Sequence, residues 1–352
     1  MPLSVRIVDF VSELLFWSAG AYHPGDKFNR GLWNNAEGLV DSRAGLDKRT
    51  GVISEDFDLT LSDRRVPLRL YLPPSSKETT SLPVIFYVHG GGFCIGSRSL
   101  WAMDTLCVKF CALGAVVIAV SYRLAPEHPF PAGLQDCYAT MRWIFDSEQS
   151  CAKLPTSSDR SRVVLMGDSA GGNLACVLAT LARDGLTADL VGGAPALPIC
   201  HLILIYPWLL VPAEKLGLSP DALKEMVAFI PEPVLSWFRA SYLRDEAVDR
   251  DRGVDRRVCP LVAGVEGLPP ITLISADLDV LRHDSRFMAE ELRNSGAAHV
   301  YRHYEGVPHG FFTFFFLAQA RAAFDDAVAD LEHVLKPGAK VMGGATGVGI
   351  DP

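Results

Sequence analysis

The sequence predicts an α/β fold built on a mostly parallel sheet that is buried on both faces. Apolar, β-branched runs recur from residue 83 onward and are separated by segments with helical patterning. These runs are continuously apolar, which is typical of parallel strands covered by helices on both sides. Two of them lead directly into Gly-rich turns. Together these three observations favour strands that alternate with helices along the chain.

The chain begins with an apolar stretch that two acidic residues, Asp9 and Glu13, interrupt. No positively charged region precedes it, so we expect an amphipathic helix that covers part of this protein rather than a secretory signal. The stretch from Gly25 to Gly51 is rich in Gly, Asn, Asp and Arg and has little periodicity. This composition suits a mobile flap near a ligand entrance.

Eight strands are expected. Two alternating runs, Glu55–Leu61 and Val66–Leu72, predict a hairpin that begins the sheet. The six buried strands are predicted at Val84–His89, Ala115–Tyr122, Val163–Gly167, Cys200–Tyr206, Ile271–Ala276 and His299–Tyr304. Good helix formers from Leu174 to Arg183 predict a helix closed by Gly185, and a final helix is predicted from Ala318 to Leu335.

An unusually long connection follows Tyr206, with two plausible helices that begin near Pro220 and Pro233. An insertion at this point is expected to form a lid over the carboxyl ends of the strands, where α/β sheets bind ligands. Its aromatic residues fit a lid core and an acyl-pocket lining equally well: Trp208, Phe229, Trp237, Phe238 and Tyr242. The remaining predicted parts are a core at 51–208 and 251–337, a cap insertion at 209–250 and a flexible tail at 338–352.

Composition excludes several classes of protein. The chain has 352 residues, 49% of them hydrophobic and 21% charged, as in globular proteins. A net charge of −8 argues against nucleic acid or an anionic membrane as the main partner. No uncharged apolar run could span a bilayer, so no stable membrane insertion is expected. The eight cysteines are scattered without metal-binding spacing, and we expect a reducing cytoplasm and no metal.

The predicted strand Val163–Gly167 enters a Gly-x-Ser-x-Gly turn that opens at once onto a helix. This context is typical of a nucleophile elbow, in which Ser169 sits at the apex and Gly167 and Gly171 avoid backbone crowding. The short pattern by itself also occurs by chance, and the alternative is a Gly-rich turn whose serine only caps the helix.

The predicted strand Val84–His89 leads into three consecutive glycines. Without side chains, the N–H groups of Gly91 and Gly92 can converge on one point, and the N–H of Ala170 can join them. Such a cluster would form a three-donor oxyanion hole. The alternatives are a plain Gly-rich loop and a phosphate cradle, although the Gly-Lys-Ser/Thr of a phosphate loop is missing.

A serine needs a base to become a nucleophile, and in this type of fold the order along the chain is Ser, Asp, His. His309 lies on a loop just after the last predicted strand, between Pro308 and Gly310, and is the candidate base. Asp277 and Asp279 both follow the preceding strand. The pattern does not distinguish these two carboxylates.

Four motifs make the sequence resemble the hormone-sensitive-lipase-like α/β hydrolases, and within them the plant-type carboxylesterases. These motifs are His89–Phe93, Tyr122–Ala132, Gly167–Asn173 and His309–Phe311. The resemblance covers about residues 55–335. It implies the α/β-hydrolase fold, with a mostly parallel eight-stranded sheet flanked by helices. It also implies a helical cap that an N-terminal cap segment at residues 1–50 builds together with the insertion at 209–250.

The resemblance also implies roles for individual residues. Ser169 would be the nucleophile, His309 the base and Asp279 the acid, although Val280 stands where many members have proline. The implied oxyanion hole consists of Gly91, Gly92 and Ala170. Residues expected to contact substrate are Phe93, Trp208 and Phe311. Expected scaffold residues are Asp168 and the ion-pairing Arg123, Glu127 and Asp136.

We therefore expect a serine carboxylic-ester hydrolase that acts on a small-molecule ester through an acyl-enzyme, without a cofactor. A tailoring hydrolase, lactonase or transesterase of specialised metabolism would use the same scaffold. A catalytically silent receptor of the gibberellin-receptor type is disfavoured because such receptors lack the triad histidine, and His309 is present. A homodimer is left open.

Overall fold

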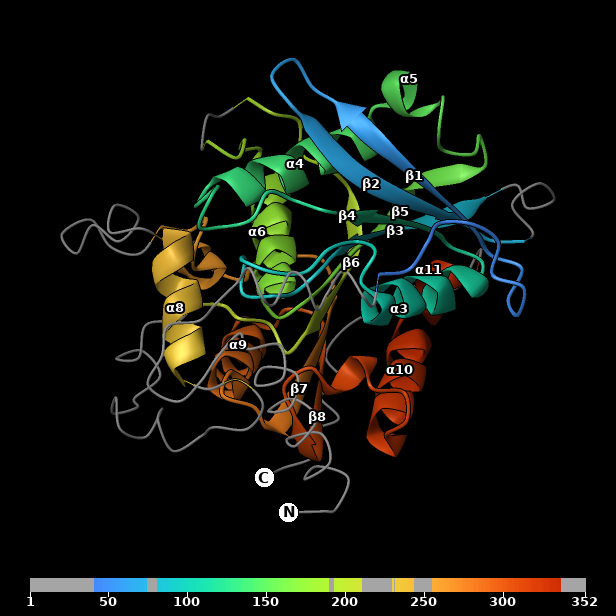
Figure 1. Cartoon of the computed structure of the whole chain (residues 1–352). Helices are drawn as coiled ribbons and strands as arrows, with labels where there is room; N and C mark the ends of the chain where they lie inside the picture. The colour runs from blue at the N-terminus through green and yellow to red at the C-terminus, as the bar shows by residue number, and fades with distance from the viewer. Residues whose placement is uncertain are drawn as a thin grey trace.

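A computed structural model describes residues 41–74, 81–189, 193–210, 230, 232–243 and 255–336. Within these ranges, eight strands form one sheet in the order β1-β2-β4-β3-β5-β6-β7-β8 (Figure 1). The strands are β1 (Ile53–Thr60), β2 (Arg65–Leu72), β3 (Leu82–Val88), β4 (Val116–Val120), β5 (Ser158–Asp168), β6 (Ile199–Ile205), β7 (Ile271–Leu278) and β8 (His299–Pro308). The eight-stranded sheet predicted from the sequence is confirmed.

The sheet is parallel except at one edge. The hairpin β1–β2 is antiparallel, and β2 pairs antiparallel with β4. Every other neighbouring pair is parallel. All residues of β3 and β4 are buried, which explains why these segments are apolar throughout. β5 begins five residues earlier than predicted, because Ser158 and Asp159 pair with β3 ahead of a register shift.

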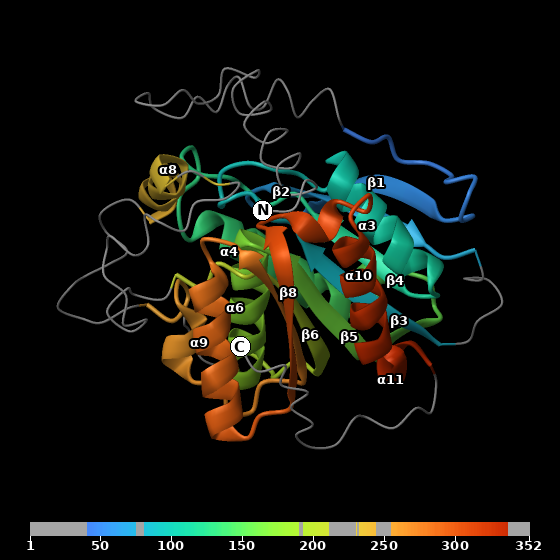
Figure 2. The ribbon, with the colours of Figure 1, turned by 90° about the horizontal axis from the view of Figure 1, so that it is seen from below.

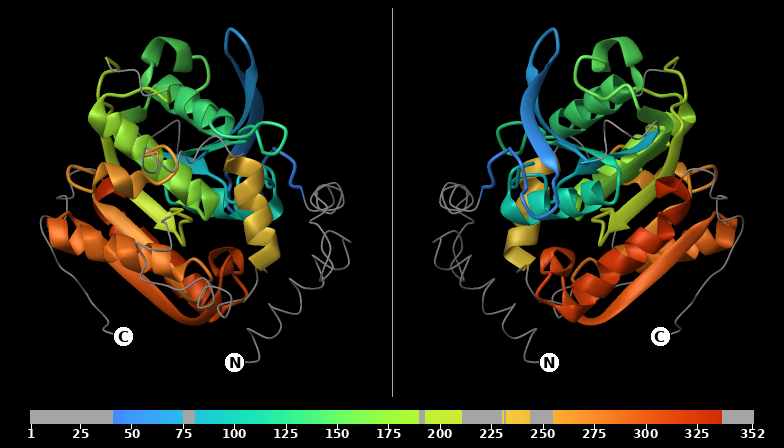
Figure 3. Two further views of the ribbon diagram at one scale, coloured as in Figure 1. Left: turned by 90° about the vertical axis from the view of Figure 1, so that its left-hand side faces the viewer. Right: turned by 90° about the vertical axis from the view of Figure 1, so that its right-hand side faces the viewer.

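Helices cover both faces of the sheet (Figure 2). The helices α4, α6 and α9 lie on one face, and α3, α10 and α11 lie on the other. A further helix, α8, drawn in yellow in Figure 3, lies outside both layers. The helices are α3 (Trp101–Ala112), α4 (Ala132–Phe145), α5 (Ser147–Ser150), α6 (Ala170–Asp184), α8 (Glu232–Leu243), α9 (Arg282–Ser295), α10 (Ala318–Asp330) and α11 (Glu332–Leu335).

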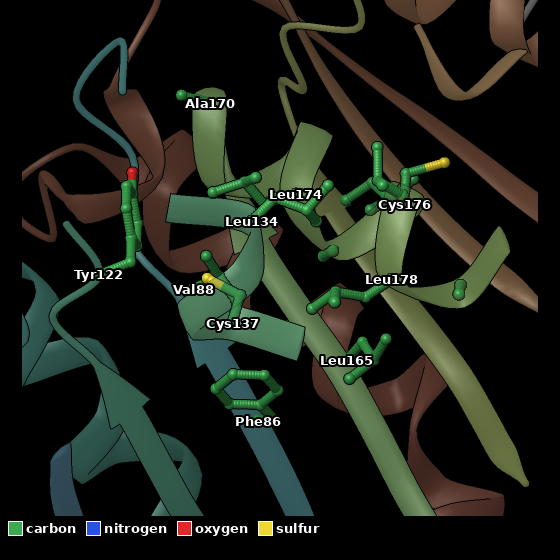
Figure 4. Close-up of a cluster of buried hydrophobic side chains, with 14 of the residues drawn as sticks. Phe86, Val88, Tyr122, Leu134, Cys137, Leu165, Ala170, Leu174, Cys176 and Leu178 are labelled. Carbon is green, nitrogen blue, oxygen red and sulfur yellow. The ribbon is translucent and has the colours of Figure 1, made fainter. Parts of the chain in front are cut away.

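The helix α6 is the centre of one core layer. Every side chain from Ala170 to Ala182 is buried, so this helix presents no polar face to solvent. Leu174 and Leu178 belong to the same buried cluster as Leu165 of β5 (Figure 4). Burial of each such leucine is worth about 1.5–3 kcal/mol. The predicted closure at Gly185 is confirmed, since this residue ends α6 in the left-handed conformation with φ 63°.

Two helix predictions can be compared with the structure. The helix expected near Pro233 is confirmed as α8. The single final helix predicted from Ala318 to Leu335 is wrong, because the helix is interrupted at Leu331, where ψ is 1°. The segment forms two helices, α10 and α11. The break follows Asp330, whose carboxylate is held by the guanidinium of Arg302 at 2.6 Å.

Other predicted features fall outside the described residues. These are the first 40 residues of the N-terminal cap segment, the helix near Pro220, Phe229 and the tail at 338–352. The division of the chain into core and cap segments stays a prediction. None of the helices in the described ranges combines the length and apolar character that crossing a membrane requires.

Candidate active site

Ser169 lies at the sharp turn between β5 and α6. Its backbone has φ 54° and ψ −121°, an unfavourable conformation for a residue with a side chain and typical of a nucleophile elbow. A Cβ atom at Gly167 would lie 2.2 Å from the carbonyl oxygen of Gly171, and one at Gly171 would lie 2.1 Å from that of Val88. The turn therefore needs glycine at both positions.

The predicted base and acid converge on this serine. Ser169 Oγ lies 2.9 Å from His309 Nε2, and His309 Nδ1 lies 2.7 Å from Asp279 Oδ2. His309 follows β8 directly, and Asp279 directly follows β7. Because these two strands are parallel neighbours, both residues lie at the same edge of the sheet. All three residues are buried, which keeps water from competing for these hydrogen bonds.

The geometry distinguishes the two aspartates. Asp279 Oδ1 accepts a hydrogen bond from the Leu281 N–H at 2.7 Å, which leaves Oδ2 directed at His309. Asp277 instead accepts a longer hydrogen bond from the Gly306 N–H at 3.3 Å and lies beside Arg282. Only Asp279 of the pair is hydrogen-bonded to the imidazole.

The expected oxyanion donors lie on the loop after β3 and at the start of α6. Gly91 and Gly92 have φ values of 116° and 59°, which few side-chain-bearing residues adopt. In the turns and loops of the described chain, the N–H groups of Gly91, Gly92 and Ala170 donate to no backbone acceptor. Ala170 is also the first residue of α6, where the helix dipole favours negative charge.

The helix α8 packs directly on this loop. A Cβ atom at Gly92 would lie 2.3 Å from Cδ2 of Phe238. The ring of Phe93 stacks on that of Tyr242, with centroids 3.8 Å apart and planes 6° apart. Phe238 and Tyr242 thus close over the Gly-rich loop, so the described helix of the predicted cap insertion contacts the site.

The three residues expected to contact substrate are all enclosed by other aromatic rings. Phe93 lies 5.6 Å from Trp208, and Phe311 lies 6.0 Å from Tyr206, both measured between ring centroids. The Trp208 N–H also donates to the carbonyl oxygen of Ser169 at 3.0 Å. Each of the three is almost completely buried. Their contact with substrate stays a prediction.

Two further tyrosines border the site and were not identified from the sequence. The ring of Tyr206 lies 4.6 Å from that of His309, and burial raises the pKa of its phenol well above 10. The Tyr87 hydroxyl donates a hydrogen bond to Asp168 Oδ1 at 2.6 Å. No short-range signal marks either residue, because each belongs to a buried apolar strand or its end.

The scaffold around the Gly-rich loop is also hydrogen-bonded. Tyr122 donates to the carbonyl oxygen of His89 at 3.0 Å and stacks on its ring. Burial lowers the pKa of His89 to about 4, so this histidine is neutral at neutral pH. Arg123 contacts buried Asp136 at 2.9 Å, as expected, and Arg64 contacts the same carboxylate at 2.7 Å.

No group of three or more His, Cys, Asp or Glu side chains in the described part of the chain is arranged to bind a metal ion. The Ser169, His309 and Asp279 side chains place a hydroxyl, an imidazole and a carboxylate in one hydrogen-bonded line. This arrangement suits acyl transfer, in which a base activates a serine and N–H groups stabilise the developing negative charge.

Comparison with known proteins places the chain among esterases. A family model described as an α/β hydrolase fold matches residues 85–313. Carboxylesterase NlhH of Mycobacterium tuberculosis is 34% identical over 261 residues, which cover 73% of this chain and 74% of that protein. Ethyl acetate hydrolase of Pseudomonas putida is 32% identical over 260 residues, with 73% and 74% covered.

Solved structures agree with this assignment. A hyperthermophilic esterase from Pyrobaculum calidifontis superposes with a TM-score of 0.71 at 28% identity, over 92% of this chain and 97% of that chain. The sheet, the family model and the sequence relatives point to the same group. The chain therefore belongs to the hormone-sensitive-lipase-like family of α/β hydrolases, and it is a carboxylesterase-type enzyme that acts on ester bonds.

Proposed function

We propose that this protein hydrolyses a small-molecule carboxylic ester through a Ser169–His309–Asp279 triad and an acyl-enzyme intermediate. The observation that carries the proposal is the continuous hydrogen-bonded line from Ser169 Oγ through both ring nitrogens of His309 to Asp279. Gly91, Gly92 and Ala170 are the proposed oxyanion donors. This combination of a nucleophile, an oriented base and free N–H groups is what two-step acyl transfer requires.

In the first step, Ser169 Oγ forms a bond to the ester carbonyl carbon while His309 Nε2 takes the hydroxyl proton. The carbonyl oxygen becomes an oxyanion that the three N–H groups stabilise. When the tetrahedral intermediate collapses, the C–O bond to the alcohol breaks, and His309 returns the proton to that oxygen. Water then repeats the sequence on the acyl-enzyme, and it releases the acid and restores Ser169.

Asp279 keeps the imidazole in the tautomer that this sequence needs. Its carboxylate accepts a hydrogen bond from Nδ1, so Nε2 is left without a proton and can accept that of Ser169. The same carboxylate stabilises the imidazolium formed in each step. A relative named ethyl acetate hydrolase supports a short acyl group for this enzyme as well.

Alternative reactions remain proposals for experiment. A lactonase or a transesterase would use the same residues, and product analysis on lactones and with alcohol acceptors separates them from a hydrolase. The distance of 2.9 Å between His309 Nε2 and Ser169 Oγ argues against a silent receptor. A cytoplasmic location and a homodimer stay predictions from the sequence.

Replacement of the proposed nucleophile tests the function. We expect Ser169→Ala to reduce kcat for p-nitrophenyl butyrate by at least about 10³-fold, since the triad acts as a unit. It should also abolish covalent labelling by a fluorophosphonate, which mass spectrometry locates on the wild-type peptide. Ser161→Ala, at an exposed serine, is the matched control. Full activity in Ser169→Ala would refute the assignment.

A further inference from the structure

We propose that Asp168 is a positioning residue for ester hydrolysis. Its carboxylate holds the loop that carries Gly91 and Gly92 at the place where their N–H groups can reach the oxyanion formed at Ser169. The inference deepens the proposed function and rests on it. Asp168 neither touches Ser169 Oγ nor takes part in proton transfer.

The contact that carries the proposal joins two segments 78 residues apart. Asp168 Oδ1 accepts a hydrogen bond from the Gly90 N–H at 2.9 Å in a buried environment. Asp168 immediately precedes the nucleophile, and Gly90 immediately precedes the first proposed oxyanion donor. This hydrogen bond therefore joins the two segments that carry the proposed oxyanion donors.

The Asp168 carboxylate lies so close to the backbone of residue 90 that only glycine fits at that position. A Cβ atom at Gly90 would lie 2.4 Å from Asp168 Oδ2 and 2.9 Å from the Asp168 carbonyl oxygen. The sequence motif thus contains a glycine that is not itself an expected oxyanion donor. Its absent side chain leaves room for the carboxylate.

A second hydrogen bond fixes the carboxylate. The Tyr87 hydroxyl donates to Asp168 Oδ1 at 2.6 Å, and its own side chain is buried. Tyr87 lies in β3, the strand that leads into the Gly-rich loop. The pKa of Asp168 is raised, because burial outweighs the hydrogen bonds from Tyr87 and Gly90 that lower it.

Other contacts hold the loop to its surroundings, among them the Tyr122 hydrogen bond to the His89 carbonyl oxygen and the stacking of Phe93 on Tyr242, but neither joins it to the residue that precedes Ser169. At its far end, the Gly91 carbonyl oxygen accepts hydrogen bonds from the N–H groups of Cys94 and Ile95, both at 3.0 Å. Without Asp168 Oδ1, Gly90 would lose its anchor to the elbow while Gly91 kept its turn. The loop could then shift relative to Ser169, and loss of a single oxyanion donor typically costs about 10²–10³-fold in kcat.

Two substitutions at this position separate the acceptor from the charge. Asp168→Ala removes the acceptor, and we expect kcat/KM for p-nitrophenyl butyrate to fall about 30- to 100-fold per folded enzyme. Asp168→Asn keeps an oxygen that can accept hydrogen bonds from Gly90 and Tyr87. We therefore expect its kcat/KM to fall by less than about 5-fold, as for a modest change in hydrogen-bond strength. Asp136→Asn, at an equally buried carboxylate bound to Arg123 and Arg64, is the matched control and should leave kcat/KM per folded enzyme unchanged.

The inhibition constant Ki of an aryl trifluoromethyl ketone distinguishes a positioning role of Asp168 from a purely structural one. Ser169 attacks its carbonyl carbon, and the resulting oxyanion occupies the same hole as that of the reaction. We expect its Ki to rise in Asp168→Ala by the same factor by which kcat/KM falls. A general loss of folded protein would instead reduce the fraction labelled by a fluorophosphonate and leave Ki constant.

Each outcome decides the question. An unchanged kcat/KM in Asp168→Ala, a fall without a matching rise in Ki, or an equal loss in Asp168→Asn would overturn the proposal. If Asp168→Ala does not fold, Tyr87→Phe removes the second hydrogen bond and should raise Ki and lower kcat/KM in parallel, and no change in either would also overturn it. Failure of the proposed function has a different signature, namely wild-type activity in Ser169→Ala.

Discussion

Substitution of Asp279 by asparagine tests the orientation of the catalytic imidazole. In the native protein, Oδ1 accepts from the Leu281 N–H at 2.7 Å and Oδ2 faces His309 Nδ1 at 2.7 Å. An asparagine amide has one oxygen and one nitrogen and can satisfy only one of these contacts as an acceptor. With its oxygen on Leu281, the amide donates to Nδ1, and His309 Nε2 then carries the proton and cannot activate Ser169.

The expected loss follows from these two contacts. The productive orientation places the amide nitrogen against the Leu281 N–H, and a buried donor left without an acceptor costs about 1–3 kcal/mol. This cost makes the productive orientation about 5- to 150-fold rarer at 1.4 kcal/mol per decade. Replacing a charged acceptor with a neutral one removes about 1.5 kcal/mol more from the imidazolium, or about 10-fold. We therefore expect kcat to fall by about 50- to 1,500-fold.

The assay is kcat for p-nitrophenyl butyrate at pH 8, normalised to folded protein by near-ultraviolet circular dichroism. Asp277→Asn is the matched control, because Asp277 is an aspartate two residues away that contacts Gly306 and Arg282 but not His309. We expect the control to keep kcat within about 3-fold, as is usual for a partly exposed surface change. A loss below 10-fold in Asp279→Asn, or a larger loss in the control, would refute the reasoning.

Two further predictions concern the loop and the core. Gly92→Ala places a methyl group 2.3 Å from the Phe238 ring at φ 59°, so we expect about 10²-fold lower kcat/KM and partial recovery in Gly92→Ala/Phe238→Ala. Burial lowers the pKa of His201 to about 3 from about 6.5 when unfolded. Below pH 6.5 only the unfolded state takes up this proton, so the wild type should lose about 2 kcal/mol of stability from this residue by pH 5. Urea unfolding of His201→Gln should show a correspondingly flatter pH profile, and an equally steep one would contradict the attribution.

Much of the fold was predictable because burial on both faces leaves a strong pattern. The five residues of β4 are all buried and all apolar, and no helix period competes with that run. The elbow was predictable for a steric reason, since Cβ atoms at Gly167 and Gly171 would collide with backbone oxygens. The break at Leu331 was not, because no proline or glycine marks it in the sequence.

The choice between Asp277 and Asp279 shows a different limit. Both follow the predicted strand Ile271–Ala276, and they are two residues apart, so strand alternation would place them on the same face and does not separate them. The register between β7 and β8 shifts between Ala276 and Leu278, and this shift sets where β7 leaves the sheet. Asp277 is still beside β8, whereas Asp279 lies past the end of the strand. A single sequence contains no information on such a bulge.

The contact between Asp168 and Gly90 depends on the order of the strands rather than on any local pattern. The sequence predicted β3 and β5 but not that they are neighbours. In the observed order they pair in parallel, with Val88 opposite Gly167, so the two Gly-rich turns leave the sheet side by side. If another strand lay between them, about 4.8 Å would be added to their separation, more than a hydrogen bond can span. The adjacency that would bring Gly91 and Gly92 to the same oxyanion as Ala170 thus also brings Asp168 to Gly90, and the proposed role of the carboxylate in holding the loop depends on this pairing of the strands.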